Sequence, residues 1–158
     1  TNNFMTKTGV RTFEAAAYLR RSGAEVTRVR KLLRENMDAY KARAEVVRHA
    51  EVYMGAFAIS YCPARELESP TIVGAQAANE LLNIKGVKAS FICTEYQNQV
   101  FVSARSIDEV NVQVIMEKLG GGGHMSSAGC QFEGMNAEAA IGIVKETLDK
   151  MIEEGELS

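Results

Sequence analysis

The chain has 158 residues, of which 46% are hydrophobic and 24% charged, with two prolines and a net charge of −2. This composition is typical of a globular domain with a sizeable core and excludes an intrinsically disordered chain. No apolar run is long enough to span a bilayer and no signal-peptide pattern opens the chain, so we expect a cytoplasmic, soluble domain.

The charge is unevenly distributed along the chain. Residues 1–50 carry 11 basic and 5 acidic side chains, whereas residues 51–158 carry 7 and 15. This contrast predicts two structural units, residues 1–50 and residues 51–158. Because the second unit is acidic, it is a poor candidate for binding a long nucleic acid, which requires a basic track.

Three cysteines, Cys62, Cys93 and Cys130, lie in apolar or strand-like stretches and form no CxxC pair. Neither a disulfide framework nor a zinc cluster is indicated. We therefore expect three buried thiols in a reducing compartment.

The first unit is predicted to be helical. Thr12 is a suitable N-cap for a helix over residues 13–21, which Gly23 would end. A single longer helix is predicted over residues 25–49, with its basic side chains on a solvated face. Its apolar residues recur at steps of three and four at Val26, Val29, Leu33, Met37, Tyr40, Ala44 and Val47.

The second unit is predicted to mix strands and helices. A buried strand covers residues 56–61, and Ser69 and Pro70 begin a helix that runs to about residue 83. Strands over residues 88–96 and 99–105 are joined by a tight turn at Gln97 and Asn98. In the helix that begins at Pro70, the residues expected to face inward are Ile72, Val73, Leu81 and Leu82.

The remaining elements complete an α/β pattern. A helix over residues 112–119 ends at Gly120, and a further strand covers residues 128–134. Asn136 caps a final helix, which Gly155 ends. The sequence therefore predicts an α/β fold with a central mixed β-sheet flanked by helices.

Four consecutive glycines follow the helix over residues 112–119, in the stretch LGGGGHMSSAG. Gly120 is explained as a helix C-cap, but Gly121, Gly122 and Gly123 are not. Successive glycines let backbone N–H groups approach an anion without obstruction by side chains. A hinge or a tight helix-to-strand connection would use the same residues, and both alternatives stay open.

Polar side chains follow these glycines directly. His124 would add a donor at the edge of the glycine loop, and Ser126 and Ser127 offer hydroxyl groups nearby. An anion with several oxygens, such as a phosphate, suits this set. The stretch is not a P-loop, because no GKS or GKT follows and the loop ends a helix where a P-loop opens one.

The strand VFVSARS carries a second candidate group. Alternation places its valines and alanine on a core face and Phe101, Ser103 and Arg105 on the other. Arginine holds phosphate through two parallel hydrogen bonds, so Arg105 and His124 could converge on one ligand. The alternative is an exposed arginine in a surface ion pair.

These stretches carry a family resemblance. GGGGHMSSAG closely resembles the GGGHxxAAG signature of the DHHA1 domain of DHH-family phosphoesterases, with Ser127 in place of the first alanine. SARSIDEVNVQVIMEKLGGGGH resembles the longer block around that signature. The opening TNNFMTKTGVRTFEAAAYLRRSGAEVTRVRKLL resembles the tail of the catalytic DHH domain. The resemblance covers nearly the whole chain and is strongest to the C-terminal part of membrane-anchored bacterial cyclic-di-AMP phosphodiesterases.

The resemblance implies a division of labour within the parent protein. A DHH domain holds two divalent metal ions, usually Mn²⁺, on Asp and His ligands, and the DHHA1 domain clamps the substrate. By carry-over, Gly121, Gly122, Gly123 and His124 would line the substrate site, with Ser103 and Arg105 beside them. The metal-binding Asp would precede Thr1, so we expect no metal, no cofactor and no complete catalytic set in this chain.

The implied activity is hydrolysis of cyclic di-AMP to linear pApA by a larger parent, with this chain inactive alone. The implied partners are cyclic di-AMP or a linear dinucleotide and the DHH domain in cis. A homodimer is a further candidate, and the sequence leaves the oligomeric state open. The alternatives are a fragment of a DHH-family oligoribonuclease or exonuclease, and a noncatalytic nucleotide- or RNA-binding module. Tyr96, Phe101 and Phe132 are candidates for stacking on a base by proximity alone.

Overall fold

The computed structural model describes residues 8–63, 67–107 and 109–157, and the chain divides into two compact units between Asn36 and Met37. The division expected near residue 50 therefore lies further along the chain than the observed one. The reason is helix α3 (Met37–Arg48), whose Val46 is fully buried in the same apolar cluster as Val73. The assignment of residues 1–50 to the C-terminal tail of a DHH domain and a connecting helix, with a DHHA1 domain over residues 51–158, stays a prediction.

The first unit contains helices α1 (Val10–Arg21) and α2 (Val26–Leu32), and neither helix buries a side chain among the described residues. Helix α1 begins three residues before the predicted start. Gly9 is its N-cap, and the hydroxyl of Thr12 accepts a hydrogen bond from the Gly9 backbone N–H at 3.3 Å. Thr12 thus stabilises the helix start from inside the first turn.

The single helix predicted over residues 25–49 is wrong. Helix α2 ends at Leu32, and α3 begins at Met37 after a break that includes Asn36. Asparagine is among the preferred N-cap residues, and Asp38 in the first turn of α3 favours a helix N-terminus there. The apolar residues keep their helical spacing across this break, so the sequence pattern did not reveal the start of a second helix.

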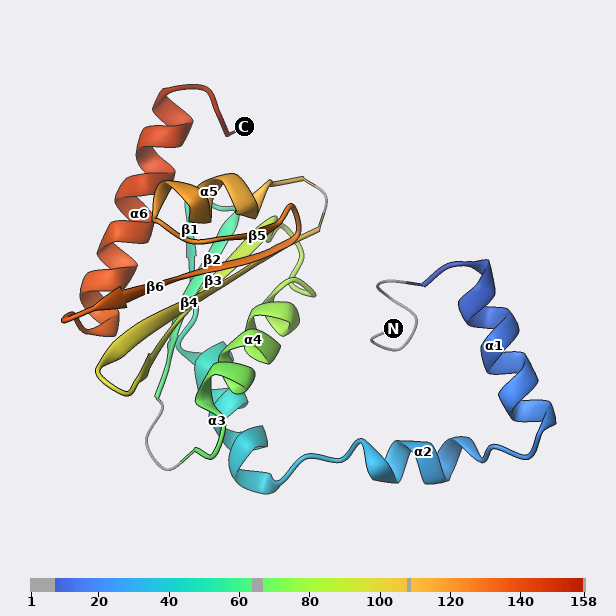
Figure 1. Ribbon diagram of the computed structural model, residues 1–158. Helices are drawn as coiled ribbons and strands as arrows, with labels where there is room; N and C mark the ends of the chain where they lie inside the picture. The colour runs from blue at the N-terminus through green and yellow to red at the C-terminus, as the bar shows by residue number, and fades with distance from the viewer. Residues whose placement is uncertain (1–7, 64–66, 108, 158) are drawn as a thin grey trace. The chain divides into compact units, whose positions relative to one another are not determined.

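A six-stranded mixed sheet forms the centre of the second unit, in the order β1-β2-β3-β4-β6-β5 (Figure 1). Strands β2 and β3 are parallel, and every other neighbouring pair is antiparallel. The predicted mixed α/β sheet is confirmed. The strands are β1 (Glu51–Tyr53), β2 (Phe57–Cys62), β3 (Ala89–Tyr96), β4 (Gln99–Ser106), β5 (Gly122–His124) and β6 (Ser127–Glu133).

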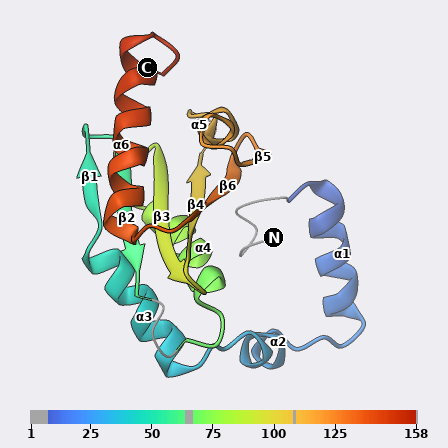
Figure 2. The ribbon, with the colours of Figure 1, turned by 60° about the vertical axis from the view of Figure 1, so that its left-hand side comes forward.

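Helices cover both faces of this sheet. Helices α3 and α4 (Pro70–Leu81) lie on one face, and α5 (Val112–Lys118) and α6 (Ala137–Glu153) lie on the other (Figures 1 and 2). One core cluster packs under α5 and α6 around Phe91, and a second packs under α3 and α4 around Ile92. The second cluster includes no residue of β4, β5 or β6, so it stops at β3.

Local signals predicted most element ends correctly. Pro70 begins α4, the Asn136 side chain accepts from the Ala139 N–H at 2.9 Å, and Gln97 and Asn98 have the positive φ of a tight turn. Ile72 is a correction, because it is 57% exposed on α4. Among the described residues, no helix is both long and apolar enough to cross a membrane.

Candidate functional site

Strand β4 separates core residues from site residues by simple alternation. Val100, Val102 and Ala104 are buried under α5 and α6. Phe101, Ser103 and Arg105 point to the other face and are half-buried. That face carries no residue of the core under α3 and α4, although α4 also packs against β4, and its half-buried side chains keep part of their surface in contact with solvent.

Three polar side chains form one row across this face. Arg105 on β4 lies directly opposite Ser127 on β6, and Ser127 lies directly opposite His124 on β5. Residues in such positions point to the same side of a sheet, with Cβ atoms about 5 Å apart. The structure therefore places Arg105 and His124 in one row, with Ser127 between them.

The Arg105 guanidinium makes only neutral contacts. Its Nη1 donates to the carbonyl oxygens of Ala104 at 2.8 Å and Ala128 at 3.5 Å, and burial lowers the pKa of Arg105. Among the described residues, no carboxylate forms an ion pair with it. A half-buried cation without a counter-ion is a natural partner for an anionic ligand.

A second row beside the first is almost free of side chains. Ser103 on β4 lies opposite Gly129 on β6, which lies opposite Gly122 on β5. A Cβ atom built on Gly122 meets no atom within 4 Å. Ala104 and Ala128 form the strand pair between the row of Arg105 and the row of Gly122. The hydrogen bonds of Arg105 to their carbonyl oxygens therefore direct the guanidinium toward the bare row.

The glycine run is not the open loop that the sequence suggested, since Gly122–His124 form strand β5. A Cβ on Gly121 would lie 2.1 Å from the Gly129 carbonyl oxygen, and one on Gly123 would lie 2.5 Å from the Ala128 Cα. Gly120 has a φ of 78°. These three glycines are required by the backbone and by the close approach of β6, so Gly122 is the one the fold leaves unconstrained.

Ser126 lies outside the row of polar side chains. With Met125 it forms the turn between β5 and β6, and its carbonyl oxygen accepts from the Ser106 N–H at 3.1 Å. The Met125 carbonyl oxygen accepts from the Val112 N–H at 2.9 Å. These contacts hold the turn against the start of α5, directly after His124 in the chain.

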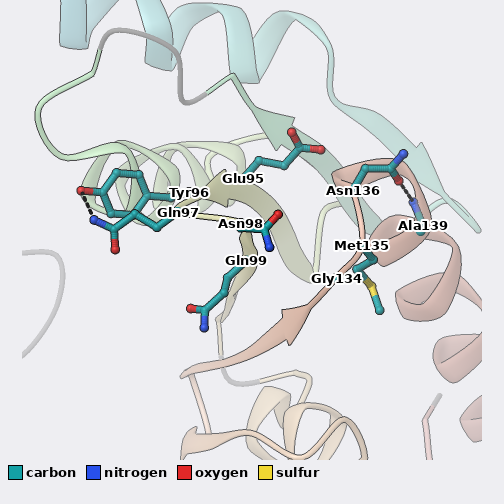
Figure 3. Close-up of a pocket in the computed structure, with 9 residues that line it drawn as sticks. All are labelled: Glu95, Tyr96, Gln97, Asn98, Gln99, Gly134, Met135, Asn136 and Ala139. Atoms are coloured by element: carbon teal, nitrogen blue, oxygen red, sulfur yellow. Dashed lines mark hydrogen bonds between the residues drawn. The ribbon is translucent and has the colours of Figure 1, made fainter.

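One hollow lies elsewhere, between the β3–β4 turn and the start of α6 (Figure 3). It has a volume of about 710 Å³, and its lining includes Tyr96, a candidate for stacking on a base, but none of the residues predicted to bind phosphate. Among the residues that the structure describes, its lining includes no lysine, arginine or histidine, so the described lining does not suit a phosphate. Glu95, which the sequence did not single out, already accepts from the Ala137 N–H at 2.6 Å there.

A second hollow of about 510 Å³ lies between α6 and strands β1 and β2. It is lined by Lys145, which pairs with Glu51, and by His49, whose ring centroid lies 5.3 Å from that of Tyr61. Its acidic side chains already outnumber its basic ones, which disfavours an anion. Among the described residues, no group of three His, Cys, Asp or Glu side chains could hold a metal ion.

The amino-acid sequence of this chain is similar to parts of two larger phosphodiesterases. The chain is 42% identical over 157 residues to the cyclic-di-AMP phosphodiesterase GdpP of Bacillus subtilis, covering 98% of this chain and 24% of that protein. It is 44% identical to the cyclic-di-AMP phosphodiesterase PdeA of Listeria monocytogenes, covering 84% of this chain and 20% of that protein. The chain thus spans less than a quarter of the length of these two relatives.

The fold is shared with a solved structure. An exopolyphosphatase-related protein from Bacteroides fragilis superposes with a TM-score of 0.75 at 19% identity, covering 91% of this chain and 44% of that one. The DHHA1 domain family matches residues 55–153, which hold the whole of the sheet from β2 onward together with α4, α5 and α6. The chain belongs to the DHHA1 domain family.

Proposed function

We propose that this chain is the substrate-binding part of a metal-dependent phosphodiesterase that hydrolyses cyclic di-AMP to linear pApA. The support is the similarity to two cyclic-di-AMP phosphodiesterases over most of this chain, together with the anion-binding character of the exposed sheet face. Catalysis would require a DHH domain elsewhere in the polypeptide.

The observation that carries the proposal is the environment of Arg105. Its charge is half-buried and, within the described part of the chain, hydrogen-bonds only to backbone carbonyl oxygens, beside a row in which Gly122 and Gly129 leave the sheet bare. A guanidinium in this setting can make two parallel hydrogen bonds to a phosphate without displacing a carboxylate.

The other residues of the face would complete the binding of a dinucleotide. Arg105 holds one phosphate, and His124, exposed at the end of the row, donates to the phosphate under attack. The hydroxyls of Ser127 and Ser103 serve as further donors, and Gly122 leaves space for the sugar–phosphate backbone. Two divalent ions in the DHH domain would activate water and stabilise the leaving oxygen.

Calorimetric titration of the chain with cyclic di-AMP, pApA and cyclic di-GMP tests the proposal. Arg105→Ala and His124→Ala should each weaken binding of cyclic di-AMP or pApA by about tenfold or more, since each removes a charge-assisted or polar contact to phosphate. Arg28→Ala, on the exposed surface of α2, is the control for loss of a positive charge. Unchanged binding in both site variants would show that the site is assigned wrongly.

Two further measurements separate this function from its alternatives. The purified chain should show no metal-dependent turnover of cyclic di-AMP, and robust turnover with Mn²⁺ would contradict the division of labour. Affinity for pApA should fall only gently with salt, because few phosphates are neutralised. A steep salt dependence with a longer oligonucleotide would favour the RNA-binding alternative.

A further inference from the structure

Phe101 is an aromatic residue without a role in either core. Its side chain is half-buried on the face of the sheet that carries Arg105, and it belongs to neither apolar cluster. Phe132, in contrast, packs against the core on the opposite face. Tyr96 lies opposite Gln99 at the β3–β4 turn, where its hydroxyl oxygen accepts from Gln97 Nε2 at 3.1 Å.

Phe101 lies in line with the phosphate-binding group. Phe101, Ser103 and Arg105 follow one another on one face of β4, so the Cα atoms of Phe101 and Arg105 lie about 13 Å apart. The guanidinium leans from Arg105 toward the bare row of Ser103, Gly129 and Gly122. A phosphate on Arg105 would therefore leave room for a sugar over the glycines and for a base at Phe101.

Gln131 lies directly opposite Phe101 on β6 and is exposed. No hydrogen bond holds its amide within the described part of the chain. An amide presents one donor and one acceptor together, which matches the N6 donor and N7 acceptor of adenine. The same edge of guanine offers two acceptors, which suit arginine better.

We propose that Phe101 and Gln131 form the base-recognition part of the site, with the base stacked on the Phe101 ring and its edge hydrogen-bonded to the Gln131 amide. The inference rests on the proposed function, because it takes the phosphate position from Arg105. It assigns the preference for adenine over guanine to Gln131, and the affinity for a base of either kind to Phe101.

NMR titrations of the chain with pApA, pGpG and ribose 5-phosphate, which lacks a base, test the two roles. Phe101→Leu should weaken pApA by about tenfold, since it removes the stacking face, and should leave ribose 5-phosphate binding unchanged. Phe101→Tyr should retain pApA binding. Gln131→Arg should shift the preference from pApA toward pGpG, whereas Gln113→Arg on α5, across the sheet, should not.

Each part of the inference can be contradicted by a separate experimental result. If Phe101→Leu binds pApA as tightly as the wild type, or loses pApA and ribose 5-phosphate equally, Phe101 does not contact a base. If Gln131→Arg leaves the ratio of pApA to pGpG affinity unchanged, Gln131 does not set the preference. If the wild type binds ribose 5-phosphate as tightly as it binds pApA and pGpG, the base-recognition inference fails and the phosphate site stands. If the wild type binds none of these ligands, the proposed function fails too.

Discussion

Arg105 on β4 and Ser127 on β6 lie directly opposite each other in an antiparallel pair, so the guanidinium and the hydroxyl share one face of the sheet. The other face of the same two strands is fixed by buried Ala104 and Ala128. A slip of one residue in register would turn Arg105 into the core. The geometry of the site is thus set by the packing of apolar residues behind it.

Arg105→Lys tests whether the planar guanidinium is needed as well as its charge. We expect affinity for pApA to fall about tenfold, because an ammonium group cannot make two parallel bonds to one phosphate. Thermal stability should change little, since the wild-type contacts are hydrogen bonds to two carbonyl oxygens only. Full pApA affinity in calorimetry would mean that the charge alone suffices.

The glycines of the run should differ in how much an alanine substitution destabilises the fold. Gly123→Ala places a Cβ at 2.5 Å from the Ala128 Cα at a φ of 145°, and Gly121→Ala places one at 2.1 Å from a carbonyl oxygen. We expect each to lower the free energy of unfolding by about 2 kcal/mol or more. Gly122→Ala should change it by about 0.5 kcal/mol or less, measured by urea denaturation.

A suitable control is Gly142→Ala at an exposed position of α6, which we expect to stabilise the fold by about 1 kcal/mol because a helical glycine is replaced. Equal losses at Gly121, Gly122 and Gly123 would contradict the close approach of β6 as the cause.

Gly122 can also be separated from folding by its effect on binding. Gly122→Val introduces a side chain into open space on the face of Arg105, and valine is well tolerated in a strand. We expect pApA affinity to fall by about tenfold or more while the midpoint of thermal unfolding stays near that of the wild type. Retained affinity in a folded Gly122→Val protein would show that the ligand does not cross the bare row.

Much of the site followed from local sequence signals, and the rest depended on long-range register. Alternation along β4 predicts that Ser103 and Arg105 share a face, because the side-chain period of a strand is two residues. No local pattern predicts that Ser127 lies between Arg105 and His124, since that depends on how β6 pairs with two other strands. For the same reason, the sequence alone did not distinguish Gly122 from its neighbours.

The errors in the fold have similar causes. Strands β1 and β5 have three residues each, too few for a periodic pattern to indicate a strand. Between α2 and α3, the spacing of Val29, Leu33 and Met37 predicts one helix, but Asn36 precedes a new one. Leu33 and Met37 remain exposed and gain little from a shared helix, so the apolar stripe does not hold α2 and α3 together, and the break falls beside a residue type preferred at N-caps.

Two acceptors satisfy the first turn of α6, and removing them should show their separate contributions. Asn136→Ala removes the bond to the Ala139 N–H, and Glu95→Ala removes the 2.6 Å bond to the Ala137 N–H. We expect each to cost about 1 kcal/mol in urea denaturation. Glu95→Gln keeps an acceptor and should recover part of the loss. No effect in either alanine variant would mean that water replaces both caps.

The buried cysteines should make the fold sensitive to alkaline pH. Burial raises the pKa of Cys62 and Cys130 to about 11 and that of Cys93 to about 12. In the unfolded chain these thiols ionise near pH 8.5. Above that pH the folded state holds protons that the unfolded state has lost, so the free energy of unfolding decreases as pH rises from about 8.5 toward 11.

A comparison of variants isolates the thiols from Tyr53 and Lys118, whose raised pKa values act in the same direction. Urea denaturation between pH 7 and 10.5 should give a shallower loss of stability for a protein with all three cysteines replaced by alanine than for the wild type. The cavities left by alanine lower the free energy of unfolding by the same amount at every pH, so they do not themselves alter its dependence on pH. Equal slopes would mean that the thiols ionise in the folded protein as easily as in water, and would contradict the effect of their burial on the pKa.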